Sequence, residues 1–126
     1  MSRYILTIPP EGPLQFIQTE DERPTLERLQ RLVGGYIEPV KMHGRILRSL
    51  PKLRMLLNEE GVMKNLPPNW SATLFSVCRY PLYGTAVVVA ADGDDYRTLT
   101  QEEVDIILDQ RTGVFAVEFI KEDKGS

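Results

Sequence analysis

The stretch Tyr83-Gly84-Thr85-Ala86-Val87-Val88-Val89-Ala90-Ala91 decides the fold of this chain. Its centre, Ala86 to Val89, is a run of small and β-branched apolar residues without polar alternation, which is typical of a strand buried on both faces. The apolar run from Thr85 to Ala91 has the length of a strand and falls far short of a membrane span. The sequence therefore predicts a buried strand over residues 83–91.

Further strands are predicted wherever bulky apolar residues stand between turn residues. They lie at residues 3–8, 14–19, 36–40, 55–58 and 114–120. Prolines and a glycine between the first two strands form a turn, so these strands should pair as a hairpin. Pro39 lacks the N–H that a sheet ladder needs, which places its strand at a sheet edge or at a bulge.

Two helices are predicted from apolar residues spaced three and four apart. The first begins near Pro24 and ends at Gly34-Gly35, because a helix end often needs a left-handed residue. The second begins at a capping box formed by Thr100 and Glu103 and is broken at Thr112-Gly113. The apolar stripes are Leu26, Leu29 and Val33 in the first helix, and Val104, Ile107 and Leu108 in the second.

Two segments remain ambiguous. Residues 41–54 have helical spacing interrupted by Pro51, which predicts a short helical turn or an irregular loop. Residues 70–77 fit a short helix or a strand equally well. Strands and helices mix without strict β–α–β alternation, so the predicted class is α+β, a mostly antiparallel β-sheet with two helices packed on it. We expect a single domain over residues 1–126 with a polar tail at 120–126.

Composition removes several classes of protein. The length of 126 residues suits one domain, and 42% hydrophobic with 26% charged residues argues against wholesale disorder. A net charge of −3 disfavours duplex DNA as a partner. One cysteine and one histidine cannot build an internal disulfide or a multi-histidine metal centre. The first apolar run breaks at Pro9-Pro10, too early for a signal peptide, so we expect a cytoplasmic protein. We also expect no cofactor and no contact with a membrane.

Residues 29–38, Leu-Gln-Arg-Leu-Val-Gly-Gly-Tyr-Ile-Glu, resemble a family of small phage and bacterial proteins of unknown function. Asn58-Glu59-Glu60-Gly61, then Asn69 with Ala72-Thr73, then Gly84 before the β-branched run, follow in that family's order. The likeness covers roughly residues 14–110 by motif order, and the Arg-rich stretch inserted after the first motif departs from it. The resemblance implies a phage or mobile-element origin and no known enzyme activity. Some phage proteins of similar size sequester cyclic-nucleotide immune signals, which is an analogy of size and setting.

Charge is distributed unevenly along the chain. Residues 41–54 carry Lys41, Arg45, Arg48, Lys52 and Arg54 and no acid, whereas residues 92–109 carry many acids and one cation, Arg97. Such an asymmetry steers an anionic ligand to one face or pairs two subunits, and two solvated faces explain it equally well. We expect a homo-oligomer, because the two blocks are complementary and the strand with Pro39 leaves a sheet edge.

Aromatic and amide side chains supply the other candidate binding residues. Trp70 and the run Arg79, Tyr80 and Tyr83 put rings beside a guanidinium, as a nucleotide requires, although core packing or an oligomer interface accounts for them too. Asn58 and Asn69 carry amides that read a base edge or cap a turn, and turn capping is the favoured interpretation.

Catalytic and metal interpretations are weaker. His43 and Cys78 are the candidates for base and nucleophile, but no strand–nucleophile–helix elbow surrounds Cys78. Asp92-Gly93-Asp94-Asp95 lacks the spaced ligands and distal Glu of a calcium loop and fits a solvated turn. We therefore expect no enzyme and no metal site, with a small hydrolase using His43 as the weakest alternative.

The predicted function is a non-enzymatic, phage-type binding protein that sequesters a small anionic nucleotide-like signal. Its ligand-binding residues are predicted to be Arg45, Arg48, Arg54, Asn58, Asn69, Trp70, Arg79, Tyr80 and Tyr83. The alternative is a phage or mobile-element accessory protein that binds a host protein through its acidic face.

Overall fold

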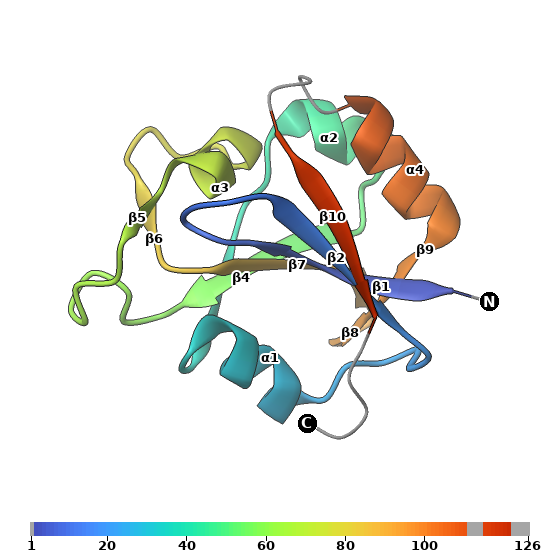
Figure 1. Ribbon diagram of the computed structural model, residues 1–126, viewed down its shortest axis with the longest axis horizontal. Helices are drawn as coiled ribbons and strands as arrows, with labels where there is room; N and C mark the ends of the chain where they lie inside the picture. Colours follow the sequence, from blue (N-terminus) through green and yellow to red (C-terminus); the bar gives the residue numbers. More distant parts are fainter. Residues whose placement is uncertain (1, 111–114, 122–126) are drawn as a thin grey trace.

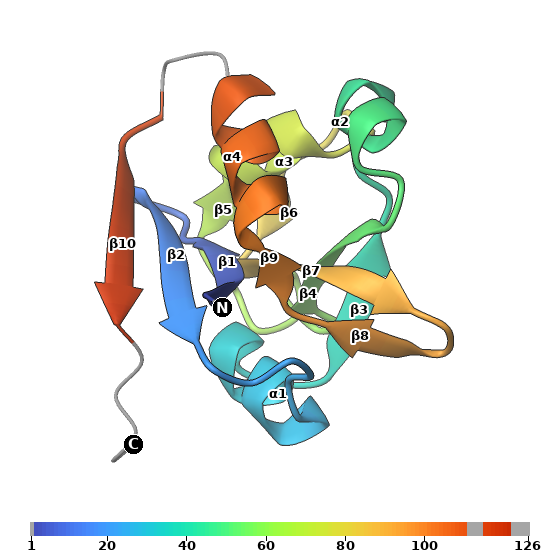
Figure 2. The same cartoon turned by 90° about the vertical axis from the view of Figure 1, so that its right-hand side faces the viewer.

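A computed structural model of the chain describes residues 2–110 and 115–121 (Figures 1 and 2). The strands are β1 (Arg3–Ile8), β2 (Leu14–Thr19), β3 (Ile37–Val40), β4 (Leu53–Asn58), β5 (Pro68–Asn69), β6 (Leu82–Tyr83), β7 (Ala86–Asp92), β8 (Asp95–Arg97), β9 (Leu99–Thr100) and β10 (Val117–Lys121). The helices are α1 (Leu26–Val33), α2 (Gly44–Ser49), α3 (Trp70–Phe75) and α4 (Gln101–Gln110).

The main sheet has eight strands and is mostly antiparallel, which confirms the predicted α+β class. Its path runs β10-β2-β1-β7-β4-β3, with β8 beside β7 and β9 beside β1, while β5 and β6 form a separate ribbon. The β1–β2 hairpin is confirmed, and β3 with Pro39 lies at the sheet edge as expected. The pair β10–β2 is parallel, with Val117 opposite Leu14. Val114, the predicted start of that last strand, lies outside the described residues.

The two predicted helices are present as α1 and α4, and the two ambiguous segments each form a further short helix. In the first segment α2 begins after His43 and stops before Pro51, which cannot continue a helix. In the second, α3 forms because the Asn69 side chain caps it by accepting a hydrogen bond from Ala72 N. The described part of the chain therefore contains four helices.

Alternation along the central strands divides the core between the two faces of the sheet. Ile5, Leu56, Val87 and Val89 pack with Leu29 and Val33 of α1 on one face. The alternate residues face the other side, in a cluster that includes Leu6, Met55, Val88, Ile46, Ala72 and Ile107. Figure 2 shows α1 on one side of the sheet, and α2, α3 and α4 on the opposite side.

Helix α1 follows its sequence signals with one correction. Thr25 is its N-cap, with Oγ1 accepting from Arg28 N at 3.1 Å, so Pro24 stands one residue before the cap instead of inside the first turn. Gly34 ends the helix at φ 82°, as predicted. Leu26 is 57% exposed and does not join the buried stripe.

The predicted strand at residues 83–91 is two strands. Gly84, at φ +86°, breaks the extended backbone between β6 and β7. A Cβ at this position would also lie 2.8 Å from Leu66 Cδ1, so the Leu66 side chain would have to move to accommodate it. Residues Ala86 to Ala90 of β7 are fully buried, which confirms the expectation that the run is covered on both faces.

The capping box of α4 is confirmed. Glu103 Oε1 accepts from Thr100 N at 2.9 Å, and Thr100 Oγ1 accepts from Glu103 N at 3.1 Å. Both oxygens of the same carboxylate also accept hydrogen bonds from the Arg97 guanidinium, from Nη1 at 2.7 Å and from Nη2 at 3.0 Å. Burial raises the pKa of Glu103, but the hydrogen bonds from Arg97 and Thr100 outweigh it and hold the pKa below its ordinary value. The predicted helix break at 112–113 lies outside the described residues.

This carboxylate makes part of the stability depend on pH. Because the folded state lowers the pKa of Glu103, its contribution is complete above the ordinary value of 4.5 and is lost as pH falls through the folded pKa. We expect Glu103→Gln to lower the free energy of unfolding at neutral pH, and its deficit from wild type to shrink at acid pH. Urea unfolding at several pH values measures the difference. Glu102→Gln, at an exposed neighbour, is the control, and an equal deficit at every pH would contradict the assignment.

Candidate functional site

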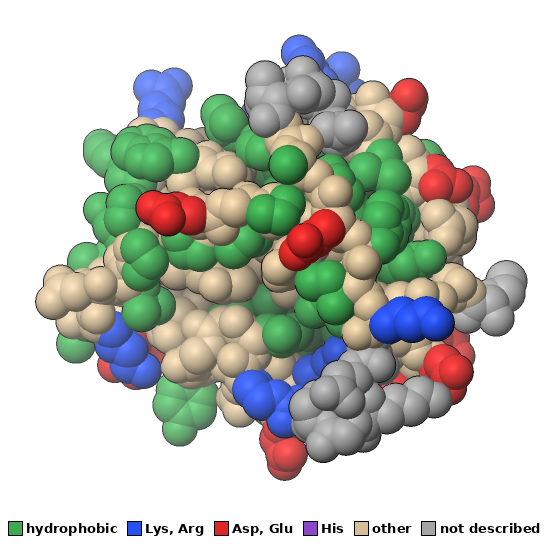
Figure 3. All heavy atoms as spheres, viewed as in Figure 1, with side chains coloured by type: hydrophobic (Ala, Val, Ile, Leu, Met, Phe, Trp, Pro, Cys, Tyr) green, Lys and Arg blue, Asp and Glu red, His purple; other side chains and the backbone are tan. Residues whose placement is uncertain are grey.

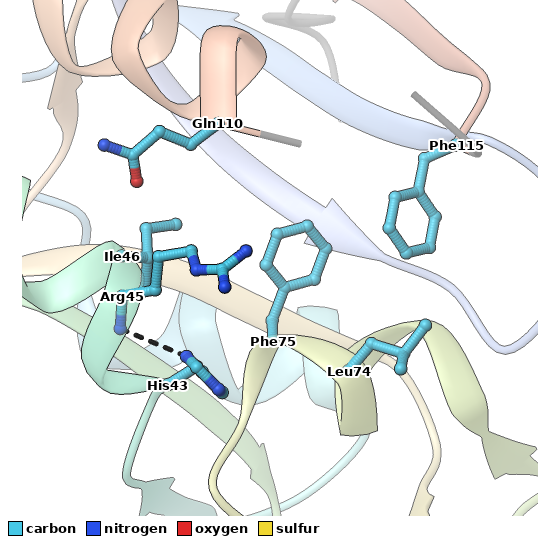
Figure 4. A pocket seen from close by; sticks show the side chains of 7 residues that line it. All are labelled: His43, Arg45, Ile46, Leu74, Phe75, Gln110 and Phe115. Carbon is cyan, nitrogen blue, oxygen red and sulfur yellow. Dashed lines mark hydrogen bonds between the residues drawn. The ribbon is translucent and has the colours of Figure 1, made fainter. Parts of the chain in front are cut away.

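Three helices meet around a pocket of about 220 Å³ on the face of the sheet opposite α1. We call it the helix pocket; it is lined by His43, Arg45, Ile46, Leu74, Phe75, Gln110 and Phe115. Figure 4 shows these side chains arriving from α2 and the residue before it, from α3, from the end of α4 and from the segment that leads to β10. Residues far apart in sequence thus form one cavity.

Helix α2 supplies the cationic side of the helix pocket. His43 caps this helix, with Nδ1 accepting from Arg45 N at 3.1 Å, and an accepting Nδ1 places the proton of a neutral ring on Nε2. Ile46 is buried and anchors the helix to the core. The Arg45 guanidinium points toward the cavity in Figure 4. Within the described residues no carboxylate pairs with it, so its charge is available to a ligand.

An aromatic pair forms the opposite wall. The rings of Phe75 and Phe115 are stacked, with centroids 5.3 Å apart and planes 29° from parallel. Leu74 extends this wall outward and is 66% exposed. Offset rings of this kind present a flat apolar surface on which another planar group can stack.

Gln110 ends α4 at the remaining side of the pocket. Its Nε2 donates to Ser49 Oγ, which ties α4 to the end of α2. Its Oε1 is buried and accepts no hydrogen bond from the part of the chain that the structure describes. A buried acceptor without a partner is uncommon and calls for an explanation.

Among the described residues, the lining combines one guanidinium, one imidazole, one amide and an apolar wall, and none of these lining side chains is acidic. Such a set suits an anion attached to a planar group. Across residues 2–110 and 115–121, no three His, Cys, Asp or Glu side chains gather closely enough to hold a metal ion.

The three arginines predicted to bind together do not converge. Arg54 lies in β4, where its Nη1 donates to the backbone oxygens of Pro51 and Leu53 at 3.0 and 2.8 Å. It lines a second cavity of about 390 Å³, the edge pocket, formed with Pro39, Val40, Lys41, Met42, Leu47, Pro51 and Leu53. Arg48 is exposed on α2 and lines neither pocket. The predicted cationic surface is divided because the chain turns from a helix into a strand within it.

Asn58 and Asn69 both cap local structure, which is the interpretation that the sequence favoured over ligand binding. Asn58 is buried, donates to Val33 O at 3.3 Å and accepts from Glu60 N at 2.8 Å, so it caps the turn after β4. Asn69 is fully buried, and its Nδ2 donates to the backbone oxygens of Ile8 and Gly84 at 2.7 and 2.8 Å. Neither side chain lines the helix pocket or the edge pocket.

The predicted aromatic cluster lies outside both pockets, and most of it is exposed. Trp70 is 60% exposed and Tyr80 is 81% exposed, while Arg79 is exposed and Tyr83 is half-buried. None of the four lines either pocket. Figure 3 shows apolar side chains gathered over the side of the molecule that carries α3, β5 and β6.

Sequence reasoning missed the apolar and amide part of the helix pocket. Leu74 and Phe75 lie in a segment whose sequence fits a helix or a strand equally well, so the sequence does not predict which face their side chains occupy. Gln110 and Phe115 lie on either side of the predicted helix break, and neither belongs to a sequence motif that indicates binding. The helical spacing of residues 70–77 was the one available signal, because it places Leu74 one turn after Trp70.

Fold and site together define a small α+β domain with one pocket built where short helices meet over a sheet. The sequence model of the DUF3846 family, described as "Domain of unknown function (DUF3846)", matches residues 1–112, and the chain belongs to this family. No curated protein and no solved structure matches it. None of the helices in the described part of the chain is both long and apolar enough to cross a membrane.

The structural role of Asn69 predicts a large loss of stability on substitution. Asn69→Ala removes two buried donors and the cap of α3, leaving two buried carbonyl groups without these partners, and should cost about 2–4 kcal/mol. Asn69→Asp keeps the cap acceptor but turns a carboxylate toward the same carbonyls, so it should also destabilise. Urea denaturation measures both. Ser71→Ala in the same helix is the control, and equal small effects in all three would contradict the assignment.

Proposed function

We propose that this protein is a non-enzymatic binding protein that sequesters a small anionic, nucleotide-like ligand in the helix pocket. The observation that carries the proposal is the Arg45 guanidinium, directed into a cavity with a stacked aromatic wall and without a described carboxylate partner. Charge-assisted contacts from a guanidinium to a phosphate or carboxylate are among the stronger hydrogen bonds in proteins. The aromatic wall suits the planar part of the same ligand.

We assign to this pocket the binding of a ligand without catalysis. His43 Nδ1 is occupied as a helix cap, and Cys78, the predicted nucleophile, is not among the lining residues. The wider setting belongs to the same proposal: a cytoplasmic protein of phage or mobile-element origin that removes a host immune signal. Its support is the analogy of size and setting with small phage proteins, together with a pocket that Arg45 enters in a chain of a family of unknown function.

The proposal predicts that Arg45 dominates ligand affinity. Arg45→Ala should weaken binding of nucleoside 5′-monophosphates by roughly 10- to 150-fold, because a charge-assisted contact is worth about 1.5–3 kcal/mol. Arg45→Lys should restore only part of the affinity, since an ammonium lacks the planar fork. Isothermal titration calorimetry with a panel of these nucleotides measures the effect.

The matched control is Arg48→Ala, one helical turn further on α2, exposed and outside the helix pocket. It removes the same charge and should change affinity little. Both variants should melt close to wild type in the absence of ligand, because exposed cations contribute little to stability. Equal losses in the two variants, or no heat from wild type with any nucleotide, would refute the proposal.

A second candidate function is the binding of a partner protein, favoured by the exposed apolar side chains near α3. Trp70, Leu74, Val77 and Tyr80 are all about half exposed or more, and clustered exposed aromatics are common at protein interfaces. The acidic face first considered for this role is partly engaged within the chain. Asp92 and Asp95 pair with Arg23, at 2.7 and 3.6 Å, and Glu103 pairs with Arg97.

The proposed homo-oligomer is testable at this apolar surface. Trp70 is the chain's one tryptophan, so its fluorescence reports on this surface alone. If copies associate here, the emission should shift to the blue as concentration rises through the micromolar range, and Trp70→Ser should reduce the mass seen by light scattering. Tyr36→Ser, at an aromatic residue 67% exposed elsewhere, is the control. An unshifted spectrum with a monomeric mass would exclude this interface.

A further inference from the structure

We propose that the helix pocket selects one class of ligand: a single planar heterocycle with an imide-type N–H that hydrogen-bonds Gln110 Oε1, bearing an anionic substituent that reaches Arg45. A uracil-type nucleotide has this chemistry. This inference rests on the proposed function and adds to it which ring the pocket accepts. Three independent features of the pocket carry it: its size, its aromatic wall and its unsatisfied amide.

The size of the pocket limits the ring. Its volume of about 220 Å³ is below the roughly 300–1,000 Å³ that drug-sized ligands occupy. A single ring fits within it, whereas a dinucleotide would project far outside. The anionic substituent therefore lies at the mouth, where Arg45 is exposed, while the ring takes the interior.

The wall of the pocket favours a flat ring over an aliphatic group. The ring centroids of Phe75 and Phe115 are 5.3 Å apart, and the buried Ile46 also lines the cavity. Base-on-aromatic stacking is a recurring source of affinity for nucleotides. Phe75 comes from α3 and Phe115 from the segment that leads to β10, so two distant parts of the chain build this wall.

Gln110 supplies the polar selectivity. Its Nε2 donates to Ser49, and its buried Oε1 has no partner among the described residues. If the amide were rotated by half a turn, the Ser49 hydroxyl would donate to Oε1 and Nε2 would be the unpaired atom. One polar atom of this amide therefore lacks a described partner in either orientation. Figure 4 shows the oxygen on the side of Arg45 and Ile46. A ligand N–H is the complement that this acceptor lacks.

The experiment is a binding cycle that changes the ligand and the protein separately. The ligands are uridine 5′-monophosphate, its N3-methyl derivative, which lacks the imide N–H, and ribose 5-phosphate, which lacks the ring. The proteins are wild type, Gln110→Ala and Phe115→Leu, each first checked for a wild-type circular dichroism spectrum. Calorimetry gives the dissociation constant of every pair.

For wild type we expect uridine 5′-monophosphate to bind at least tenfold more tightly than ribose 5-phosphate or the N3-methyl derivative. In Gln110→Ala the effect of N3-methylation should disappear, because the acceptor is absent. In Phe115→Leu the advantage over ribose 5-phosphate should shrink, since the stacking ring is lost. This pattern supports the hydrogen bond and the stack independently.

Two other results separate this inference from the proposed function. If uridine 5′-monophosphate and ribose 5-phosphate bind wild type equally and both lose affinity in Arg45→Ala, the anion site stands and the ring selectivity is wrong. If N3-methylation costs the same affinity in wild type and Gln110→Ala, the hydrogen bond to Gln110 is wrong. If none of the three ligands binds, both the inference and the proposed function are overturned.

Discussion

The fold depends on one constraint: strand β7 has no polar face between Ala86 and Ala90. Residues Ala86 to Ala90 of β7 are fully buried, and their side chains alternate between two apolar clusters. A sheet with such a strand at its centre must be covered on both sides. Helix α1 covers one side with Leu29 and Val33, and the three remaining helices share the other. The helix pocket lies on that second face, where α2, α3 and the end of α4 meet.

Polar contacts fix the positions of those short helices. Helices of six residues have little stability of their own, so their ends need caps. His43 caps α2, Asn69 caps α3 while binding the backbone beside β1 and β7, and Thr100 with Glu103 caps α4. These caps determine where Arg45, Phe75 and Gln110 point. The buried asparagine is thus important to the pocket without touching a ligand.

Much of the fold followed from local sequence signals, whereas the site did not. The β1–β2 hairpin, the edge position of Pro39, the glycine at the end of α1 and the capping box of Thr100 were all predicted, because each depends on a few neighbouring residues. The two short helices were ambiguous at their length, and the parallel pairing of β10 with β2 depends on a long-range contact. Of the predicted ligand residues, only Arg45 lines the helix pocket. The two asparagines are bound to backbone groups, as their favoured capping interpretation implied, whereas no sequence pattern indicated the backbone contacts of Arg54.

The central claim is that a small anionic ligand occupies the space between α2, α3 and the end of α4. A titration of the isotope-labelled protein with uridine 5′-monophosphate, followed by amide chemical shifts, tests it most directly. The account predicts saturable shifts concentrated at residues 43–47, 74–75 and 110, from three separate parts of the sequence. Shifts confined to residues 77–83, or no shifts at saturating nucleotide, would contradict it.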